Sequence, residues 1–304
     1  MSDRMAKSGH PVLQMIGVSR HFVQGENQIS ILDEANFSLQ PGETVALVAP
    51  SGSGKSTLVR HVNRLIEPTA GDVFINGEDV GRLTPKALRH LRSHTIGMVF
   101  QHMALWTHRT ILQNVGYGLE IRGVKKAKRD KAALEALEVM QLSGWHNHYP
   151  DQLSGGMQQR VGLARALCAD PDILLMDEPF SALDPLIRRQ LQDQFLELSA
   201  VMKKTTLFIT HDLAIAKYFA WEGRIGVMYL GRIVELGKTQ ELIANPQHPY
   251  TKALLKTIPS VRGQRAERLT VIDGQPPILG GAPIACPFLD RCDVAMDKCR
   301  QQNP

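Results

Sequence analysis

The chain has 304 residues, a formal net charge of +5 and a hydrophobic content of 43%, enough to build the core of one large domain or two ordinary ones. Its longest apolar runs, at residues 173–176 and 206–210, are far shorter than the roughly 20 residues of a membrane-spanning helix. No apolar stretch follows the charges of the first residues, so we expect no secretory signal and a cytoplasmic protein.

The first part of the chain predicts a β-rich start. Short β-like runs at residues 12–18, 35–39 and 44–49 alternate with turn residues. Residues 73–80, VFINGEDV, add a hairpin that turns at Asn76-Gly77.

The pattern becomes helical from about residue 102 to 165, with an amphipathic segment at 132–140. The basic residues are scattered except at 122–131, RGVKKAKRDK, which we interpret as the solvated start of a helix. A patch for lipid or nucleic acid is the alternative interpretation of that run.

Two buried strands, at 172–179 and 205–212, flank a helix at 186–202, an alternation typical of a parallel sheet in an α/β fold. After Gly237 we expect one helix-like segment and then a tail rich in glycine, proline and cysteine. We therefore place a boundary near residue 238, with a main domain at 12–237 and an extension at 238–304.

Residues 48–57, VAPSGSGKST, nearly match the phosphate-loop pattern G-x-x-x-x-G-K-[ST], except that Ala49 stands where the pattern has glycine. A strand precedes the loop and a helix follows it, as a true phosphate loop requires. At the strand exit we expect Ala49 to have a negative φ, which makes alanine tolerable. Backbone N–H groups, a lysine ammonium and a serine hydroxyl that reaches Mg²⁺ would hold the phosphates. The predicted nucleotide contacts are Gly52, Ser53, Gly54, Lys55, Ser56 and Thr57.

The strand at 173–177 ends in two carboxylates, Asp177 and Glu178. Because the carboxyl ends of parallel strands share one edge of the sheet, we expect these acids beside the phosphate loop. Asp177 then belongs to the Mg²⁺ shell, and Glu178 orients and deprotonates the water that attacks the γ-phosphate. The alternative is a pair of solvated loop acids.

Residues 153–160, LSGGMQQR, resemble the signature sequence of the nucleotide-binding subunits of ATP-binding cassette (ABC) transporters. The resemblance implies that Ser154, Gly155 and Gly156 meet the γ-phosphate bound by the other protomer, so that ATP joins a head-to-tail dimer. A helix N-terminus, with its free N–H groups and positive dipole end, suits such an anion.

The same resemblance assigns four further residues. Gln101 is similar to the glutamine that links Mg²⁺ and the attacking water to the permease-contacting region. His211 is similar to the histidine that contacts the γ-phosphate, and Asp184 to the residue that couples the two sites across the dimer. Phe22 resembles the aromatic residue that stacks on adenine, with His21 as its rival.

The resemblance covers about residues 12–240. It implies an α/β fold, the P-loop NTPase fold of an ABC nucleotide-binding domain. This fold has a β-rich antiparallel subdomain, a parallel-sheet core and a helical subdomain at about 102–165, followed here by a short C-terminal extension. It also implies an ATPase that uses ATP and Mg²⁺ in a homo- or heterodimer. The expected partners are an integral permease and, indirectly, a solute-binding protein, and we expect no nucleic acid. The expected location is peripheral, on the cytoplasmic face of the inner membrane.

Different parts of the chain resemble different transporters, as in a natural or engineered mosaic. The segment after Gln101 resembles importers of glycine betaine, choline and proline, whereas the C-terminal part resembles oligopeptide, dipeptide and nickel importers. The loop with Ala49 resembles lipoprotein-releasing ATPases, which keeps an exporter subunit open. A non-transport ABC ATPase is disfavoured because only about fifty residues separate Gln101 from Ser154. We favour an osmoprotectant as the solute, with peptides as the alternative, since docking on the permease is a surface property.

Four cysteines are present, three of them near the C-terminus. Cys286, Cys292 and Cys299 keep the spacing of the peptide-importer tail, for which the resemblance implies an iron–sulfur cluster. Three thiolates are one fewer than the usual four, so reduced, partly buried cysteines are the favoured interpretation. Cys168 is interpreted as a packing residue of a helix.

Overall fold

The computed structural model describes residues 10–25, 27–101, 103–181, 185–202, 204–257, 274 and 285–301. The chain divides into two compact units. The first unit contains the chain up to Gln40, Thr44–Gly81 and the chain from Ile209 onwards, and the second contains Pro41–Glu43 and Arg82–Phe208. Within the described ranges, no helix combines the length and the apolar character that crossing a bilayer demands.

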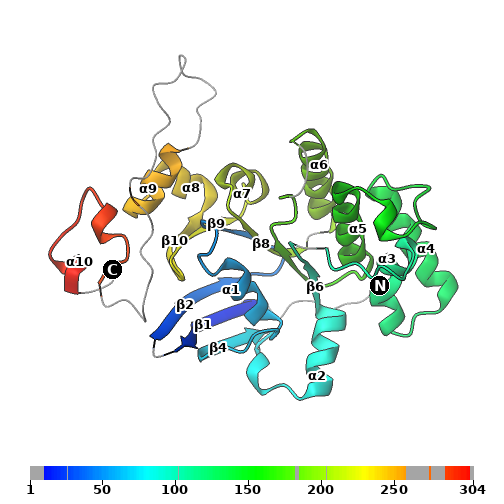
Figure 1. The fold of residues 1–304 in the computed structure, drawn as a ribbon, viewed down its shortest axis with the longest axis horizontal. Coiled ribbons are helices and arrows are strands. Elements are labelled where there is room, and N and C mark those ends of the chain that lie inside the picture. Colours follow the sequence, from blue (N-terminus) through cyan, green and yellow to red (C-terminus); the bar gives the residue numbers. More distant parts are fainter. Residues whose placement is uncertain are drawn as a thin grey trace, which may run out of the picture. The chain divides into compact units, whose positions relative to one another are not determined.

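The first unit contains a four-stranded sheet in the order β2-β1-β4-β5, which Figure 1 shows in blue and cyan. β1 pairs antiparallel with β2 on one side and with β4 on the other. The predicted Asn76-Gly77 turn is confirmed: both residues have positive φ, 51° and 80°, as a two-residue hairpin loop between β4 and β5 requires. The strands are β1 (Leu13–Gln24), β2 (Asn27–Leu39), β4 (Ala70–Ile75) and β5 (Glu78–Asp79).

The first unit also holds strands of a second sheet, in which β3 lies parallel to β9 and β10 lies antiparallel to β9. The strand order continues from β3 to β8, which crosses the boundary between the units. β3 is buried from Val45 onwards, as expected for the centre of a sheet. The strands are β3 (Thr44–Val48), β8 (Thr205–Thr210), β9 (Arg224–Tyr229) and β10 (Arg232–Lys238), and the helices of this unit are α1 (Lys55–Val62), α7 (Leu213–Phe219), α8 (Thr239–Ala244), α9 (Pro249–Lys256) and α10 (Lys298–Gln301).

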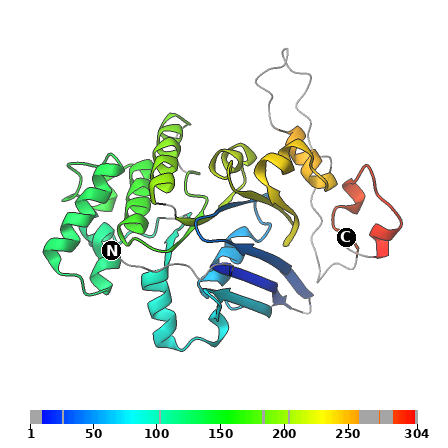
Figure 2. The same cartoon turned by 180° about the vertical axis from the view of Figure 1, so that it is seen from behind.

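In the second unit, β7 (Ile173–Asp177) pairs parallel with β6 (Ile96–Val99), and the strand order runs β8-β7-β6. All five residues of β7 are buried, which confirms the predicted parallel strand. Three helices of this unit pack against one another, and Figure 2 shows them as a green cluster. They are α3 (Ile111–Ile121), α4 (Lys126–Val139) and α5 (Gly155–Cys168); the other helices are α2 (Pro85–His90), a π-helical turn (Leu91–Thr95) and α6 (Pro185–Met202).

The structure differs from the sequence prediction at several elements. β6, β9 and β10 are strands that the pattern did not reveal. The segment after Gly237 forms two helices instead of one, because Pro249 begins a new helix whose N-terminus is capped by the ring of His248. The basic run at 122–131 leads into α4, where exposed Lys126 pairs with Asp130 at 2.7 Å, so that helix has a solvated face. This hydrogen bond also lowers the pKa of Asp130.

Candidate active site

The loop between β3 and α1 has the shape of an anion cradle. Gly54 precedes α1 with a φ of 91°, and its carbonyl accepts the N–H of Leu58 at 2.9 Å to begin the helix. Lys55 is only 5% exposed, and its Nζ donates to the carbonyls of Ala49 at 2.7 Å and Pro50 at 2.8 Å. The Ser53 hydroxyl also donates to Pro50 at 2.7 Å. The lysine and the loop therefore form one hydrogen-bonded unit at a helix N-terminus, with Ser56 and Thr57 in the first helical turn.

Two glycines give this loop a conformation that other residues would not adopt. Gly52 has a φ of 79°, in the left-handed region. A Cβ on Gly54 would lie 2.5 Å from the carbonyl oxygen of Ile31 in β2. Because the backbone approaches β2 this closely, the cradle needs glycine at 54, and the loop fits a phosphate held by backbone N–H groups.

Ala49 is compatible with the loop. It is 1% exposed, and it is not among the described residues other than glycine that have positive φ. Its N–H donates to the carbonyl of Thr210 at 3.3 Å, and its own carbonyl accepts from Lys55. The expected backbone geometry at this position is confirmed, so the methyl group carries no backbone strain.

His211 directly follows β8, whose last residue, Thr210, accepts the Ala49 N–H at the entrance of the phosphate loop. The histidine is exposed, and Asp212 next to it caps α7 by accepting from the N–H groups of Ala214 and Ile215. The first unit therefore brings together His211 and the start of the phosphate loop.

Phe22 lies on β1, with its side chain 39% exposed. The guanidinium of Arg20 sits 4.4 Å from the centre of the Phe22 ring, a cation–π contact that the sequence did not suggest. His21 faces the other way, as successive side chains of a strand do, and its buried Nδ1 has no hydrogen-bond partner within the described chain. The exposed ring at this point of β1 is therefore that of Phe22.

In the second unit, the register of β6 and β7 brings the segments that carry Gln101 and the two acidic residues to one edge of the sheet. Val99 is opposite Met176, so the residues that follow each strand leave the same edge of the sheet. Asp177 is buried at 1% exposure, and Glu178 is partly exposed. Gln101 therefore leaves the sheet at the same edge as Asp177 and Glu178.

Glu178 has a φ of 47°, a left-handed conformation that is uncommon for glutamate. Its carbonyl accepts the N–H of Ser181 at 3.2 Å and the Ser181 hydroxyl at 3.0 Å. A residue held in such a sparsely populated region after a buried strand is typical of a functional position.

The signature residues lie at the start of α5 in the second unit. Ser154 is the N-cap, and its hydroxyl accepts the N–H of Met157 at 3.3 Å. Ser154 and Gly155 are exposed, and a Cβ on Gly155 would meet no atom within 4 Å. Because crowding within the chain does not require this glycine and glycine weakens a helix, its small size favours close approach of another molecule. Gly156 follows in the first turn of the helix.

The structure gives less information about two other predicted sites. Asp184 lies outside the described residues. The N–H of Cys286 donates to the carbonyl of Cys299 at 2.9 Å, and burial raises the pKa of the Cys286 thiol. Within the described residues, no three His, Cys, Asp or Glu side chains gather as a metal-binding group, and Cys286, Cys292 and Cys299 are partly buried free thiols.

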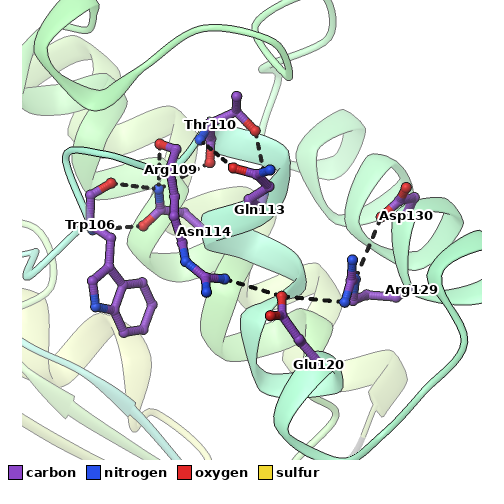
Figure 3. Close-up of polar contacts among 8 residues, drawn as sticks. All are labelled: Trp106, Arg109, Thr110, Gln113, Asn114, Glu120, Arg129 and Asp130. Carbon is purple, nitrogen blue, oxygen red and sulfur yellow. Dashed lines mark hydrogen bonds and ion pairs between the residues drawn. The ribbon is translucent and has the colours of Figure 1, made fainter.

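A cavity of about 490 Å³ opens in the second unit, next to the chain that follows β6. Aromatic and aliphatic side chains line it, among them Phe100, Trp106, Tyr117 and Ile121, together with the cationic Arg92 and Arg165. Figure 3 shows how Asn114 secures the loop that carries Trp106: its amide contacts the carbonyls of Trp106 and Arg109.

Sequence reasoning missed one contact of the phosphate loop. Gly231, in the turn between β9 and β10, donates its N–H to the carbonyl of Ser53 at 3.2 Å. The available signal was a glycine between two β-like runs in YLGRIVELG, which indicates a turn but not what the turn touches.

The chain matches known families along most of its length. The family described as ABC transporter matches residues 32–181, and the oligopeptide/dipeptide transporter C-terminal region matches 234–299. The glycine betaine transport ATP-binding protein OpuAA of Bacillus subtilis is 51% identical over 227 residues, which cover 75% of this chain and 54% of that protein. ProV of Escherichia coli, of glycine betaine/proline betaine transport, is 43% identical over 80% of this chain and 60% of its own. The chain thus spans little more than half the length of these betaine relatives.

A putative peptide import ATP-binding protein of Brucella ovis is 40% identical over 298 residues, which cover 97% of this chain and 93% of that protein. Among solved structures, the dimeric ATP-binding cassette MJ0796 bound to ADP and phosphate aligns with a TM-score of 0.70 at 34% identity, over 75% of this chain and 98% of its own. CbiO1 of Clostridium perfringens, part of an ABC transporter complex, aligns with a TM-score of 0.68 at 25% identity, over 78% of this chain and 92% of its own. The motifs, the fold and these relatives agree: the chain belongs to the ATP-binding proteins of ABC transporters.

Proposed function

We propose that the chain is the ATP-hydrolysing subunit of an ABC importer, which couples ATP-driven dimerisation and hydrolysis to solute uptake. The observation that carries this proposal is Glu178, held with a φ of 47° directly after buried β7, at the sheet edge where the segment with Gln101 also leaves β6. A carboxylate fixed in this way suits a general base for water.

The phosphate loop supplies binding. The N–H groups from Ser53 to Thr57 and the Lys55 ammonium would hold the β- and γ-phosphates, since oriented N–H groups at a helix N-terminus attract anions. Lys55 would leave its two carbonyl partners to contact the nucleotide. Phe22 would stack on the adenine, with Arg20 behind its ring.

Ser56, Gln101 and Asp177 would hold Mg²⁺, which supplies neutralisation of phosphate charge when bound. Their hydroxyl, amide and carboxylate oxygens are the ligands that this ion prefers. Glu178 would take the proton of the attacking water, and His211 would help to position that water beside the γ-phosphate.

The exposed start of α5 would complete the site of a second protomer. Ser154, Gly155 and Gly156 would contact the γ-phosphate bound by that protomer, and Asp184 would couple the two sites. The dimer would therefore close around two ATP molecules and open after hydrolysis, a cycle that drives alternating access. The solved structure of dimeric MJ0796 with ADP and phosphate supports the formation of a dimer.

The 490 Å³ cavity after β6 supports docking of an integral permease, because its aromatic lining offers apolar area and three arginines, Arg89, Arg92 and Arg165, offer charge. Such docking would place the chain peripherally on the cytoplasmic face of the inner membrane. A solute-binding protein would act indirectly, through the permease.

We propose an osmoprotectant such as glycine betaine or proline as the solute. The support is the 51% identity to OpuAA, which includes the permease-facing segment after Gln101. A dipeptide or oligopeptide is the second candidate, favoured by the C-terminal match at 234–299 and by the alignment with the Brucella ovis protein over nearly its whole length.

The test of catalysis compares Glu178→Gln with Lys55→Ala. Glu178→Gln should bind ATP and dimerise but lose turnover by about 10²- to 10⁴-fold, because the base is gone while the phosphate contacts remain. Lys55→Ala should weaken ATP binding by about tenfold to a hundredfold, because a charge-assisted contact is lost. ATPase rates, equilibrium dialysis with ATP and sedimentation would measure these effects. Appreciable turnover by Glu178→Gln would refute the base assignment.

The test of the solute also uses Glu178→Gln, the variant expected to bind ATP and dimerise without turnover. Glu178→Gln would be purified from membranes of the source cells in MgATP, and the co-purifying permease identified by mass spectrometry, with Lys55→Ala as the control. A betaine-type permease is expected. A peptide-type permease would overturn the osmoprotectant proposal and establish the second candidate.

A further inference from the structure

The turn between β9 and β10 has a backbone conformation that is unfavourable for one of its residues, Leu230. Leu230 and Gly231 both have positive φ, 46° and 84°, and Tyr229 pairs with Arg232 across the turn. Two left-handed residues make a tight two-residue hairpin loop, but leucine rarely adopts that conformation. Neighbouring contacts must therefore hold the turn.

Those contacts come from β2. The carbonyl of Gly231 accepts the N–H of Asp33 at 3.1 Å. The Arg232 guanidinium pairs with the carboxylate of Asp33 at 2.7 Å, and Asp33 is only 5% exposed. Asp33 thus donates one hydrogen bond to the turn and accepts another from Arg232 at its end. These two contacts leave the turn little conformational freedom.

The same turn is fastened to the phosphate loop. The N–H of Gly231 donates to the carbonyl of Ser53 at 3.2 Å. A Cβ on Gly231 would lie 2.5 Å from the Ile31 carbonyl oxygen, the same atom that a Cβ on Gly54 would approach to 2.5 Å. The turn and the phosphate loop thus both pack closely against the same backbone carbonyl of β2, that of Ile31.

This hydrogen bond acts on a phosphate-binding group through covalent geometry. The carbonyl of Ser53 and the N–H of Gly54 belong to one planar, trans peptide unit and point in opposite directions. Fixing the carbonyl by the Gly231 N–H therefore also fixes the direction of the Gly54 N–H, which opens the row of donors at the start of α1.

The C-terminal segment 285–301 contacts Tyr229, the residue that precedes this turn. Arg291 donates to the hydroxyl of Tyr229 at 3.0 Å, and Tyr229 is 2% exposed. The ring of Phe288 meets the Tyr229 ring edge-on, with ring centres 5.4 Å apart, and Tyr250 packs on Tyr229 at 4.6 Å. The segment thus holds the residue that enters the Leu230-Gly231 turn.

We propose that Arg291 and Tyr229 are positioning residues for ATP binding, which act on the phosphate loop through the Leu230-Gly231 turn. Contact between Arg291 and Tyr229 keeps the turn in place, and the turn keeps the Ser53-Gly54 peptide in its phosphate-binding orientation. The C-terminal segment therefore sets the affinity for ATP without touching the nucleotide. This inference rests on the proposed role of residues 50–57 as the phosphate loop.

The experiment compares Tyr229→Phe, Arg291→Met and the double variant of the full chain. Each single variant should raise the Kd and the KM for ATP by about threefold or more, with kcat at saturating ATP unchanged. The double variant should lose no more than the stronger single variant, because both substitutions remove one contact. Arg300→Met is the matched control, since exposed Arg300 lies in the same segment and should leave the Kd unchanged.

Thermal unfolding of each variant without nucleotide separates positioning from misfolding, because Tyr229→Phe removes one hydroxyl and leaves the ring packing in place. An unchanged ATP Kd in both single variants, or an equal rise in Arg300→Met, would overturn the inference. Lys55→Ala separates it from the proposed function: if this variant keeps its ATP affinity, the phosphate-loop assignment fails. If Lys55→Ala loses affinity while neither Tyr229→Phe nor Arg291→Met does, only the positioning role fails.

Discussion

At position 49 a methyl group occupies the place that the phosphate-loop pattern reserves for glycine. The residue is buried, has no positive φ and uses both backbone groups in hydrogen bonds, its N–H to Thr210 and its carbonyl to Lys55. Glycine at 54 is different, because any side chain there would collide with the Ile31 carbonyl. Two positions of one motif therefore have opposite tolerance for a Cβ.

We predict that Ala49→Gly lowers the free energy of unfolding by about 1 kcal/mol, because the unfolded chain gains freedom and a buried methyl is lost. The ATP Kd should stay within about twofold of the original, since a tenfold change needs 1.4 kcal/mol of altered binding. Urea unfolding and equilibrium dialysis would measure both quantities. Gly54→Ala is the control and should abolish tight ATP binding; markedly tighter binding by Ala49→Gly would contradict the interpretation.

At the scale of elements, α3 anchors the loop that precedes it. Asn114 is fully buried; its Oδ1 accepts the N–H of Trp106 at 2.9 Å, and its Nδ2 contacts the carbonyls of Trp106, Arg109 and Thr110 at 3.0–3.1 Å. Figure 3 shows this side chain between the loop and the helix. One amide thus shapes the wall of the cavity in which Trp106 packs on Tyr117 with ring centres 4.0 Å apart.

Asn114→Ala should therefore lower the free energy of unfolding of the second unit by about 2–4 kcal/mol, because it leaves several buried backbone groups without partners. The matched control is Gln113→Ala, which removes only the exposed contact to the Thr110 N–H and should cost about 1 kcal/mol or less. Hydrogen exchange of the second unit and urea unfolding would report the difference. Equal losses in the two variants would show that the buried amide is not the anchor.

Across the whole molecule, each unit contains a weak acid whose pKa burial raises well above its ordinary value. Burial raises the pKa of Tyr250 in the first unit to about 12, and that of Cys168 in the second unit to about 11. Their ordinary pKa values are 10.0 and 9.0. Between the ordinary and the raised value of each group, the unfolded chain binds fewer protons than the folded chain, so stability must fall as pH rises.

We predict that the free energy of unfolding is insensitive to these two groups below pH 9 and decreases as the pH rises from 9 towards 12. Urea unfolding at several pH values, monitored by a separate signal for each unit, would measure how steeply the free energy of unfolding falls with pH. Cys168→Ala should flatten the decrease in the second unit, and Tyr250→Phe that in the first. A slope that both variants leave intact would mean that neither group is the cause.

Much of the fold and of the candidate site could be predicted because the signals are local. The apolar run of β7, the Asn76-Gly77 turn and the loop from residue 50 to 57 each depend on neighbours in sequence. β10 escaped prediction because its residues are only partly buried, and α8 and α9 were predicted as one segment although Pro246 and Pro249 mark the break between them. The domain boundary near 238 and the roles of the site residues remain predictions.

The sequence by itself determined the family and predicted the chemistry, since a lysine, a serine and acids at strand ends can be identified from residue types and spacing. Only the tertiary structure decided which groups meet. The register of β6 and β7 brings the segments that carry Gln101 and Glu178 to one edge of the sheet, and Gly231 and Gly54 both closely approach the Ile31 carbonyl. The physical reason is that hydrophobic periodicity and turn propensity act within a few residues, whereas register and close backbone approach arise from packing between segments far apart in the chain.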